Sequence, residues 1–285
     1  MNNLKIIECP RDAMQGLSDF IPTDKKVEYL DKLLQVGFDT LDFGSFVSPK
    51  AVPQMKDTAN IVSKLDLSNS KTKLLAIIAN LRGAKEASSF EQIQYLGYPM
   101  SISETFQQKN TNMSIVDSLG ELVGIGEICQ QQGKGLVVYI SMAFGNPYGD
   151  QYNAKIVTQF ADVLATLGAS VSSLADTVGI ATPNEIKDLF IAVKEMSDKV
   201  EWGVHLHATD ENANAKIEAA LAAGCKRIDG AILGFGGCPM ADNKLVGNIN
   251  TRKILEIANK QNLSTGLDIN TFNEAELMAS SIFNG

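Results

Sequence analysis

The chain has 285 residues, of which 45% are hydrophobic and 20% charged, so it can bury a large core in one or two domains. Its formal net charge is −8 and no basic stripe is evident, so we expect no nucleic-acid partner. No apolar run approaches the roughly 18 residues of a membrane span, and the first residues lead into a predicted strand rather than a signal peptide, so no membrane association is expected.

The four cysteines, Cys9, Cys129, Cys225 and Cys238, are scattered along the chain without a C-x-x-C spacing. Disulfides or an all-cysteine zinc site are therefore not expected. A reducing, cytoplasmic location fits this cysteine usage best.

Apolar runs of strand length alternate with amphipathic stretches of helical length along the whole chain. Strands are predicted at residues 4–8, 38–43, 73–79, 93–98, 136–141, 170–174, 200–207 and 227–232. Helices are predicted at residues 24–36, 52–65, 83–89, 115–132, 153–167, 183–196, 211–223 and 251–261. Thr23 or Asp24 before the first helix and Thr182-Pro183 at the sixth are typical helix starts.

Eight strand and helix units, at about 36 residues each, predict an α/β fold of the (β/α)8 or TIM-barrel type, as a single catalytic domain over residues 1–285. A doubly wound open sheet would favour a glycine-rich phosphate turn after the first strand, where the chain instead reads Cys9-Pro10-Arg11-Asp12-Ala13. Segments 101–114 and 234–250 have room to be active-site loops or lids. A short helical extension from about residue 266 is expected to pack against the barrel.

Polar residues follow every predicted strand of this barrel. Because the carboxyl ends of the strands share one rim, these residues can meet although they are far apart in sequence. The set is Arg11, Asp12, Asp42, Ser45, Asn80, Arg82, Ser101, Glu104, Tyr139, Ser141, Asp176, Thr177, His205, His207, Cys238 and Asn248.

His205 and His207 are the only histidines and lie one residue apart at the end of the predicted seventh strand. Residues i and i+2 of a strand face the same way, so the two imidazoles can bind one metal ion. A histidine is more often an ordinary polar residue, but the shared strand end and the following glycine-rich loop favour a metal or catalytic role. Asp12 and Asn248 could complete a ligand set suited to Mg²⁺, Mn²⁺ or Zn²⁺.

Arg11 and Asp12 also have ordinary explanations. Asp12 could be a helix-capping or loop carboxylate, and Arg11 a surface or ion-paired residue. Beside a metal ion, however, a fixed guanidinium would stabilise a developing enolate oxygen.

The loop Gly234-Phe235-Gly236-Gly237-Cys238-Pro239 places a single thiol in flexible backbone. Cys238 could be an inert buried residue in a tight turn. The flanking glycines and proline favour a positioned loop instead, in which the thiol acts as nucleophile or general acid.

Four blocks of sequence are similar to the hydroxymethylglutaryl-CoA lyase family. They are Ile7 to Gln15 (IECPRDAMQ), Asp42 to Met55 (DFGSFVSPKAVPQM), His205-Leu206-His207, and Gly234 to Ala241 (GFGGCPMA) with Gly247-Asn248 beyond. The second and fourth blocks resemble the lyases in particular. Arg-Asp and His-x-His also resemble the wider metal-dependent barrel group, which includes isopropylmalate and homocitrate synthases and the carboxyl-transfer domain of pyruvate carboxylase.

The resemblance implies cleavage of 3-hydroxy-3-methylglutaryl-CoA to acetoacetate and acetyl-CoA, with a divalent metal, Mg²⁺ or Mn²⁺ before Zn²⁺, on Asp12, His205, His207 and Asn248. It implies that Arg11 stabilises the thioester enolate and that Cys238 protonates the acetyl-CoA carbanion. The expected catalytic residues are Arg11, Asp42, Cys238 and His205, and the expected substrate-binding residues are Gln15, Ser45, Tyr139, Asp176 and Thr177. No other cofactor is expected.

The implied partners are an acyl-CoA substrate and a second copy of the chain in a homodimer. Lys50, Arg82 and Lys109 are candidates for the CoA phosphates, although each could equally be an ordinary surface charge. Leucine degradation is the pathway that the resemblance suggests.

The chain departs from the family pattern in several places. Asp42 stands where the family usually has Glu, and His207-Ala208-Thr209-Asp210-Glu211 lacks the usual Asp after the histidine and the Tyr-Gly that follows. Met142 and Asn146 replace cysteines, and Ala175 replaces a glycine. The metal ligands are untouched, so the departures bear on the substrate rather than on the metal.

Two other functions stay open. The first is a related metal-dependent lyase, aldolase or Claisen synthase acting on another hydroxyacyl-CoA or keto acid, although a chain ending at Gly285 leaves no room for the extra region of the synthases. The second is a non-catalytic metal-binding barrel, which the presence of Arg11 and Cys238 disfavours. The fold alone does not decide between them.

Overall fold

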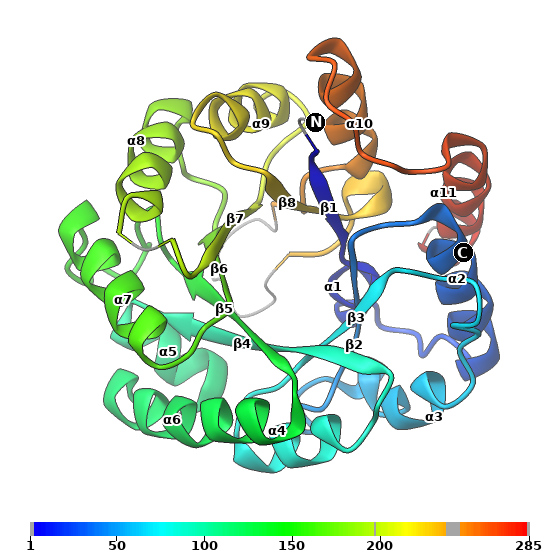
Figure 1. Ribbon diagram of the computed structural model, residues 1–285, viewed down its shortest axis with the longest axis horizontal. Coiled ribbons are helices and arrows are strands. Elements are labelled where there is room, and N and C mark those ends of the chain that lie inside the picture. Colours follow the sequence, from blue (N-terminus) through cyan, green and yellow to red (C-terminus); the bar gives the residue numbers. More distant parts are fainter. Residues whose placement is uncertain (1–2, 197, 238–245, 284–285) are drawn as a thin grey trace.

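Eight parallel strands close into a barrel in the order of the sequence, from β1 to β8, with helices around the outside (Figure 1). The structure is a computed structural model that describes residues 3–196, 198–237 and 246–283. The closed barrel confirms the predicted fold class, and β1 pairs directly with β8 from Lys5 and Arg227 to Glu8 and Gly230.

The strands are β1 (Lys5–Glu8), β2 (Thr40–Ser45), β3 (Lys73–Ile77), β4 (Ile93–Ser101), β5 (Gly135–Ser141), β6 (Val171–Asp176), β7 (Glu201–Leu206) and β8 (Arg227–Gly230). The helices are α1 (Pro10–Gln15), α2 (Thr23–Val36), α3 (Thr58–Val62), α4 (Leu81–Ser88), α5 (Glu104–Thr111), α6 (Ile115–Gln132), α7 (Ala154–Thr166), α8 (Pro183–Lys194), α9 (Ala213–Ala222), α10 (Thr251–Lys260) and α11 (Ile269–Phe283). Two short 3-10 helices are η1 (Pro53–Met55) and η2 (Ile232–Gly234). None of the helices in these ranges is long and apolar enough to cross a lipid bilayer.

No helix was predicted in residues 101–114, the candidate active-site loop or lid, and this is wrong because α5 occupies most of that segment. The Ser103 hydroxyl accepts a hydrogen bond from the Phe106 amide at 3.2 Å and so caps the helix start. Asn112 ends the helix in a left-handed conformation with φ of 57°. The mixed polar sequence of α5 has no clear helical periodicity. The capping residues Ser103 and Asn112 were the signal from which this helix could have been predicted.

The single helix predicted at residues 52–65 is also wrong, because η1 and α3 divide it. The Gln54 carbonyl accepts a hydrogen bond from the Lys26 ammonium group, and the Gln54 side-chain oxygen accepts one from the Ile21 amide at 2.9 Å. These contacts with α2 and the segment before it hold the Gln54 peptide outside a continuous helical ladder.

The segment after β8 returns across the carboxyl rim of the barrel. Ala231 and Asn250 form a parallel bridge, and His207 and Asn248 form an antiparallel one. Asn248 is thereby placed beside the end of β7. Cys238, predicted on this loop, lies outside the described residues.

The hydrophobic core has two parts. The larger part lies between the barrel and its helices, and α11 joins it through edge-to-face contacts of Phe272 with Phe38 and of Phe283 with Tyr29. The smaller part fills the barrel interior with Leu75, Ile77, Val137, Tyr139 and Val171. The barrel is thus a packed scaffold, which holds rim residues in fixed positions.

Lys216 on α9 is a buried cation that supports the rim from below. Its ammonium group donates to Asp176 Oδ2 at 2.6 Å, to the Gly179 carbonyl at 2.9 Å and to the His207 carbonyl at 2.8 Å. Three donors thus meet three acceptors, which is what a buried ammonium requires. The contact joins the ends of β6 and β7.

Glu8, the last residue of β1, is fully buried and links the two ends of the barrel sheet. Its Oε1 accepts a hydrogen bond from the Ile232 amide at 2.7 Å, and its Oε2 accepts one from the Thr251 hydroxyl at 2.6 Å. Burial raises the pKa of Glu8 to about 8, although these two hydrogen bonds lower it in part. The folded state therefore holds a proton here that the unfolded chain has already released.

We predict that the free energy of unfolding falls as the pH rises, because the folded state loses this proton. Because the pKa is higher in the folded state, the stabilisation is fully present below about pH 4.5 and is lost as the pH rises to about 8. In a plot of the free energy of unfolding against pH, Glu8→Gln should make the slope shallower by up to about 1.4 kcal/mol per pH unit. The measurement is the urea midpoint of both proteins across this range, and equal slopes would contradict the prediction.

Candidate active site

A cavity of about 170 Å³ opens at the carboxyl rim of the barrel. One side, from α1, β6 and β7, is polar and is lined by Arg11, Asp12, Gln15, Thr177, His205 and His207. The opposite side, from β2 to β4 and α5, is mostly apolar and includes Val47, Ala51, Val52, Ile77, Ala79, Pro99 and Phe106. The cavity therefore offers a charged end and an apolar wall to one ligand.

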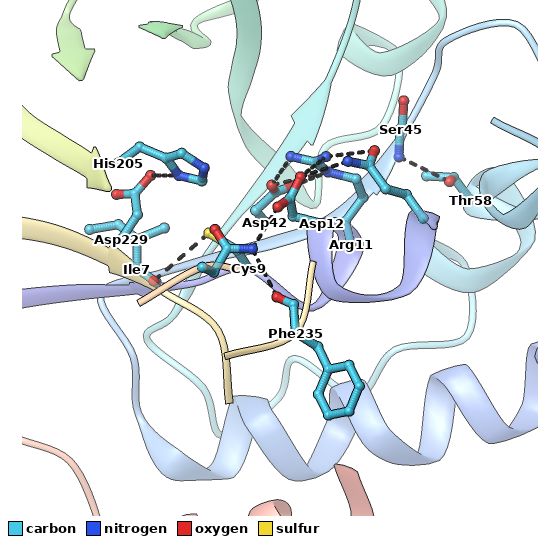
Figure 2. A network of polar contacts seen from close by, with 12 residues as sticks. Ile7, Cys9, Arg11, Asp12, Asp42, Ser45, Thr58, His205, Asp229 and Phe235 are labelled. Atoms are coloured by element: carbon cyan, nitrogen blue, oxygen red, sulfur yellow. Dashed lines mark hydrogen bonds and ion pairs between the residues drawn. The ribbon is translucent and has the colours of Figure 1, made fainter. Parts of the chain in front are cut away.

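Arg11 lies at the centre of the polar side. It comes from α1, a short helix that the sequence analysis did not predict and that begins at Pro10 directly after β1. Its Nε donates to Asp42 on β2 at 3.1 Å, and its Nη1 donates to Asp12 Oδ1 at 2.8 Å and to Gln15 Oε1 at 2.9 Å (Figure 2). These contacts fix the guanidinium before any substrate arrives.

Asp12 is held on both carboxylate oxygens. Oδ1 also accepts from Gln15 Nε2 at 2.7 Å, and Oδ2 accepts from Asn248 Nδ2 at 2.6 Å. Burial raises the pKa of Asp12, but Arg11 and the two histidines outweigh this effect and bring the pKa down to about 2. The group is therefore a permanent anion at neutral pH.

The two histidines are oriented through their Nδ1 atoms. His205 Nδ1 lies 3.1 Å from Asp229 Oδ2, and His207 Nδ1 lies 3.0 Å from the Thr177 carbonyl. Both partners can only accept, so Nδ1 carries the proton and Nε2 is the free acceptor in each neutral ring. Burial lowers the pKa of His205, but Asp229 and Asp12 together raise it above its ordinary value, whereas burial and His205 lower the pKa of His207 to about 4.

These residues fit a divalent metal ion. Asp12, His205 and His207 each offer a ligand atom within 4.8 Å of the others. His207 Nε2 is buried and has no hydrogen-bond partner among the described residues, which is costly unless something binds it. A Cβ on Gly236 would lie 2.5 Å from Asn248 Nδ2 and 2.9 Å from Asp12 Oδ2, so only glycine lets the loop close over this donor set.

The other predicted substrate-binding residues divide into two groups. Gln15, Ser45, Tyr139 and Thr177 line the cavity, and the Tyr139 ring lies edge-on to His205 with centroids 5.6 Å apart. Asp176 is not among the lining residues, because Lys216 and the amides of Ile180 and Ala181 occupy its carboxylate. Within the described ranges, this carboxylate supports the rim rather than facing a ligand.

The three candidates for the CoA phosphates lie outside the lining of this cavity. Lys50 is exposed beyond β2. Arg82 donates to Glu86 at 3.0 Å and to the Phe46 carbonyl at 3.1 Å, and the Lys109 ammonium lies 4.5 Å from the Tyr148 ring centroid. That these three residues bind the CoA phosphates stays a prediction.

Asp42 is nearly fully buried and binds Arg11 through both its oxygens. The shorter side chain that departs from the family pattern therefore still reaches the guanidinium. Burial raises the pKa of Asp42 to about 6, although Arg11 lowers it. Asp42 is not among the residues that line the cavity, and it positions Arg11.

Sequence reasoning missed Asp229 and Lys216, which orient His205 and the His207 backbone. Asp229 lies two residues after Arg227 on β8, so both face the same side of the strand, and Asp229 pairs in register with His205. The period-two pattern of that strand could have placed Asp229 at the rim. Lys216 on α9 gave no such signal.

The fold and this donor set define a TIM-barrel enzyme with a candidate divalent-metal centre at its carboxyl rim. The HMGL-like family profile matches residues 3–278. The chain therefore belongs to the HMGL-like family, a family of lyases.

Curated relatives agree with this assignment. The rat protein named 3-hydroxy-3-methylglutaryl-CoA lyase, cytoplasmic, is 32% identical over 275 residues, covering 95% of this chain and 79% of the relative. A Pseudomonas aeruginosa protein named 3-hydroxy-3-isohexenylglutaryl-CoA/hydroxy-methylglutaryl-CoA lyase is 32% identical over 266 residues, covering 93% of this chain and 88% of the relative.

Solved structures agree as well. An HMG-CoA lyase from Acinetobacter baumannii in complex with coenzyme A and 3-methylmalate has a TM-score of 0.92 at 26% identity, covering 99% of this chain and 92% of that one. The hydroxymethylglutaryl-CoA lyase from Pseudomonas aeruginosa has a TM-score of 0.91 at 30% identity, covering 100% and 94%. The carboxyl transferase domain of Rhizobium etli pyruvate carboxylase, at 16% identity and a TM-score of 0.76, shares the fold.

We predict that Asp12→Asn and His207→Ala each weaken Mn²⁺ binding by at least about 100-fold. Removing a residue that only orients a ligand can already cost about 100-fold, and these substitutions change the ligands themselves. Asp210→Asn, which removes an exposed carboxylate that pairs with Lys253, should leave the affinity unchanged. Calorimetric titration measures the affinity. Native-like Mn²⁺ binding by both site variants would place the metal elsewhere.

Proposed function

We propose that this protein is a divalent-metal-dependent lyase that cleaves 3-hydroxy-3-methylglutaryl-CoA to acetoacetate and acetyl-CoA. The observation that carries the proposal is the set of Asp12, His205 and His207, of which the first and last are buried, beside the fixed Arg11. The names of the curated relatives and the coenzyme A bound to the Acinetobacter lyase support the substrate class.

Asp12, His205 and His207, with the Asn248 amide, would hold the ion. Bound there, it would supply positive charge that acidifies the substrate hydroxyl and orients the adjacent oxygens. Mg²⁺ or Mn²⁺ suits the mixed nitrogen and oxygen donors, and Zn²⁺ also accepts them. Asp229 and the Thr177 carbonyl keep both Nε2 atoms turned toward the site.

Cleavage starts when a base removes the proton of the 3-hydroxyl group. The C3 oxygen becomes a ketone, the bond between C2 and C3 breaks, and its electron pair passes into the thioester as an enolate. Four of the five Arg11 N–H groups are used by Asp42, Asp12 and Gln15, which leaves one for the enolate oxygen. A proton from the Cys238 thiol at C2 then completes acetyl-CoA.

The apolar wall of Val47, Val52, Ile77 and Phe106 would pack against the carbon skeleton and keep water from the enolate. This wall also favours a second candidate substrate, a 3-hydroxyglutaryl-CoA with a larger alkyl group at C3. The double name of the Pseudomonas relative supports such a group.

We also propose that the protein works as a homodimer in the cytoplasm. Relatives bear both cytoplasmic and mitochondrial names, such as the mouse mitochondrial lyase at 31% identity over 95% of this chain. The cysteine usage supports the cytoplasmic assignment.

The test is an assay of the Mn²⁺-loaded protein with 3-hydroxy-3-methylglutaryl-CoA that follows acetyl-CoA and acetoacetate. We expect equal amounts of both products at about 1–10³ turnovers per second, and none after chelation. Cleavage of only a longer 3-alkyl homologue would favour the second candidate. No cleavage of either by the metal-loaded protein would refute lyase activity on this substrate class.

We predict that Cys238→Ser keeps the metal affinity but lowers kcat by at least about 100-fold, the usual share of a general acid. Cys129→Ser, at a buried thiol on α6, is the matched control and should keep kcat. Steady-state kinetics of the three proteins measure the effect. A fully active Cys238→Ser protein would show that another group protonates C2.

A further inference from the structure

A second cluster of donor atoms lies beneath the rim. Cys9, His205 and Asp229 each place one ligand atom within 4.8 Å of the others. Cys9 follows β1, His205 is on β7 and Asp229 is on β8, and Figure 2 shows the three side chains close together. Cys9 and Asp229 are buried, with 1% and 2% exposure.

This cluster differs in chemistry from the set at the rim. Asp12, His205 and His207 offer one oxygen and two nitrogens, whereas Cys9, His205 and Asp229 offer sulfur, nitrogen and oxygen. A thiolate selects soft and borderline ions such as Zn²⁺ and Cd²⁺ over Mg²⁺ and Mn²⁺. The Cys9 thiol is weakly engaged, because its hydrogen bond to the Ile7 carbonyl spans 4.0 Å.

The charges around the cluster favour a cation. Burial raises the pKa of Cys9 well above its ordinary value, and the carboxylates of Asp229, Asp42 and Asp12 raise it further. The same negative field that opposes a thiolate attracts a divalent ion, which replaces the thiol proton. His205 lines the active-site cavity with 13% of its side chain exposed, which gives an ion a route to the cluster.

We propose that Cys9, His205 and Asp229 form an inhibitory site for a thiophilic divalent cation such as Zn²⁺. His205 belongs to both donor sets, so the two sites are coupled through one imidazole. Binding releases the thiol proton to solvent and shifts the single ring proton of His205 from Nδ1 to Nε2, and three bonds form from the ion to sulfur, nitrogen and oxygen. The ion then replaces the hydrogen bond from Nδ1 to Asp229 that orients the ring, and the protonated Nε2 can no longer bind a metal ion at the rim.

The experiment is a titration of the Mg²⁺-saturated protein with Cd²⁺, followed by the near-ultraviolet charge-transfer absorption of a cadmium–thiolate bond. It is done in a Cys238→Ser background, so that the thiol proposed above as the proton donor cannot contribute to the band. We expect one equivalent to produce the band, Cys9→Ser to abolish it, and Cys129→Ser, which changes another buried thiol, to retain it.

Asp229→Asn provides a variant that keeps a hydrogen-bond acceptor for His205 and leaves the thiol in place. It should weaken Cd²⁺ binding by at least about tenfold, as expected for loss of a charged ligand. No band in the Cys238→Ser background, or an unchanged band in Cys9→Ser, would overturn the proposal. The readout does not depend on the substrate, so it can fail or succeed independently of lyase activity.

Inhibition adds a separate measurement. If lyase activity is present, Zn²⁺ should inhibit the Mg²⁺-loaded protein, and Cys9→Ser should raise the inhibition constant by at least about tenfold. Equal inhibition of both proteins would show that Zn²⁺ acts at the rim and not at Cys9.

Discussion

The buried guanidinium of Arg11 is the interaction on which the site depends. It ties α1 to β2 through Asp42 and to its own helix through Asp12 and Gln15. A buried charge is tolerated only when it is paired, so this network leaves Arg11 one position. Its single positive charge faces the two carboxylates of Asp12 and Asp42, and this unbalanced pairing is a physical reason for the rim to attract a cation.

The two imidazoles depend on a different constraint. One Nδ1 is held by a carboxylate from β8 and the other by a backbone carbonyl after β6, so both rings are fixed from outside the donor set. Lys216 in turn holds the His207 carbonyl and the end of β6. The rim geometry is therefore built by buried polar groups that lie behind the Asp12–His205–His207 set. Among the described residues, this network ends at His207 Nε2, which has no hydrogen-bond partner.

The sequence predicted the barrel because each of its strands forms a distinct apolar run. It also placed Asp12, His205, His207 and Asn248 on one rim, and the structure brings them together. It did not reveal α1, which has only six residues, or the break in residues 52–65, which comes from contacts with α2. Asp176 was predicted to bind substrate because its partner Lys216 is 40 residues away in the sequence, and a local pattern cannot predict such a pair.

Of the departures from the lyase pattern, Ala175 alone is among the described residues that line the cavity. None falls on the donor set, and Asp42 still reaches Arg11. The apolar wall comes from β2 to β4 and α5, whereas the donors come from α1, β7 and the segment after β8. Because different strands supply the two sides, a change in one wall need not move the other. The proposed bond-breaking chemistry and the proposed choice of acyl group would thus be physically separable in this barrel.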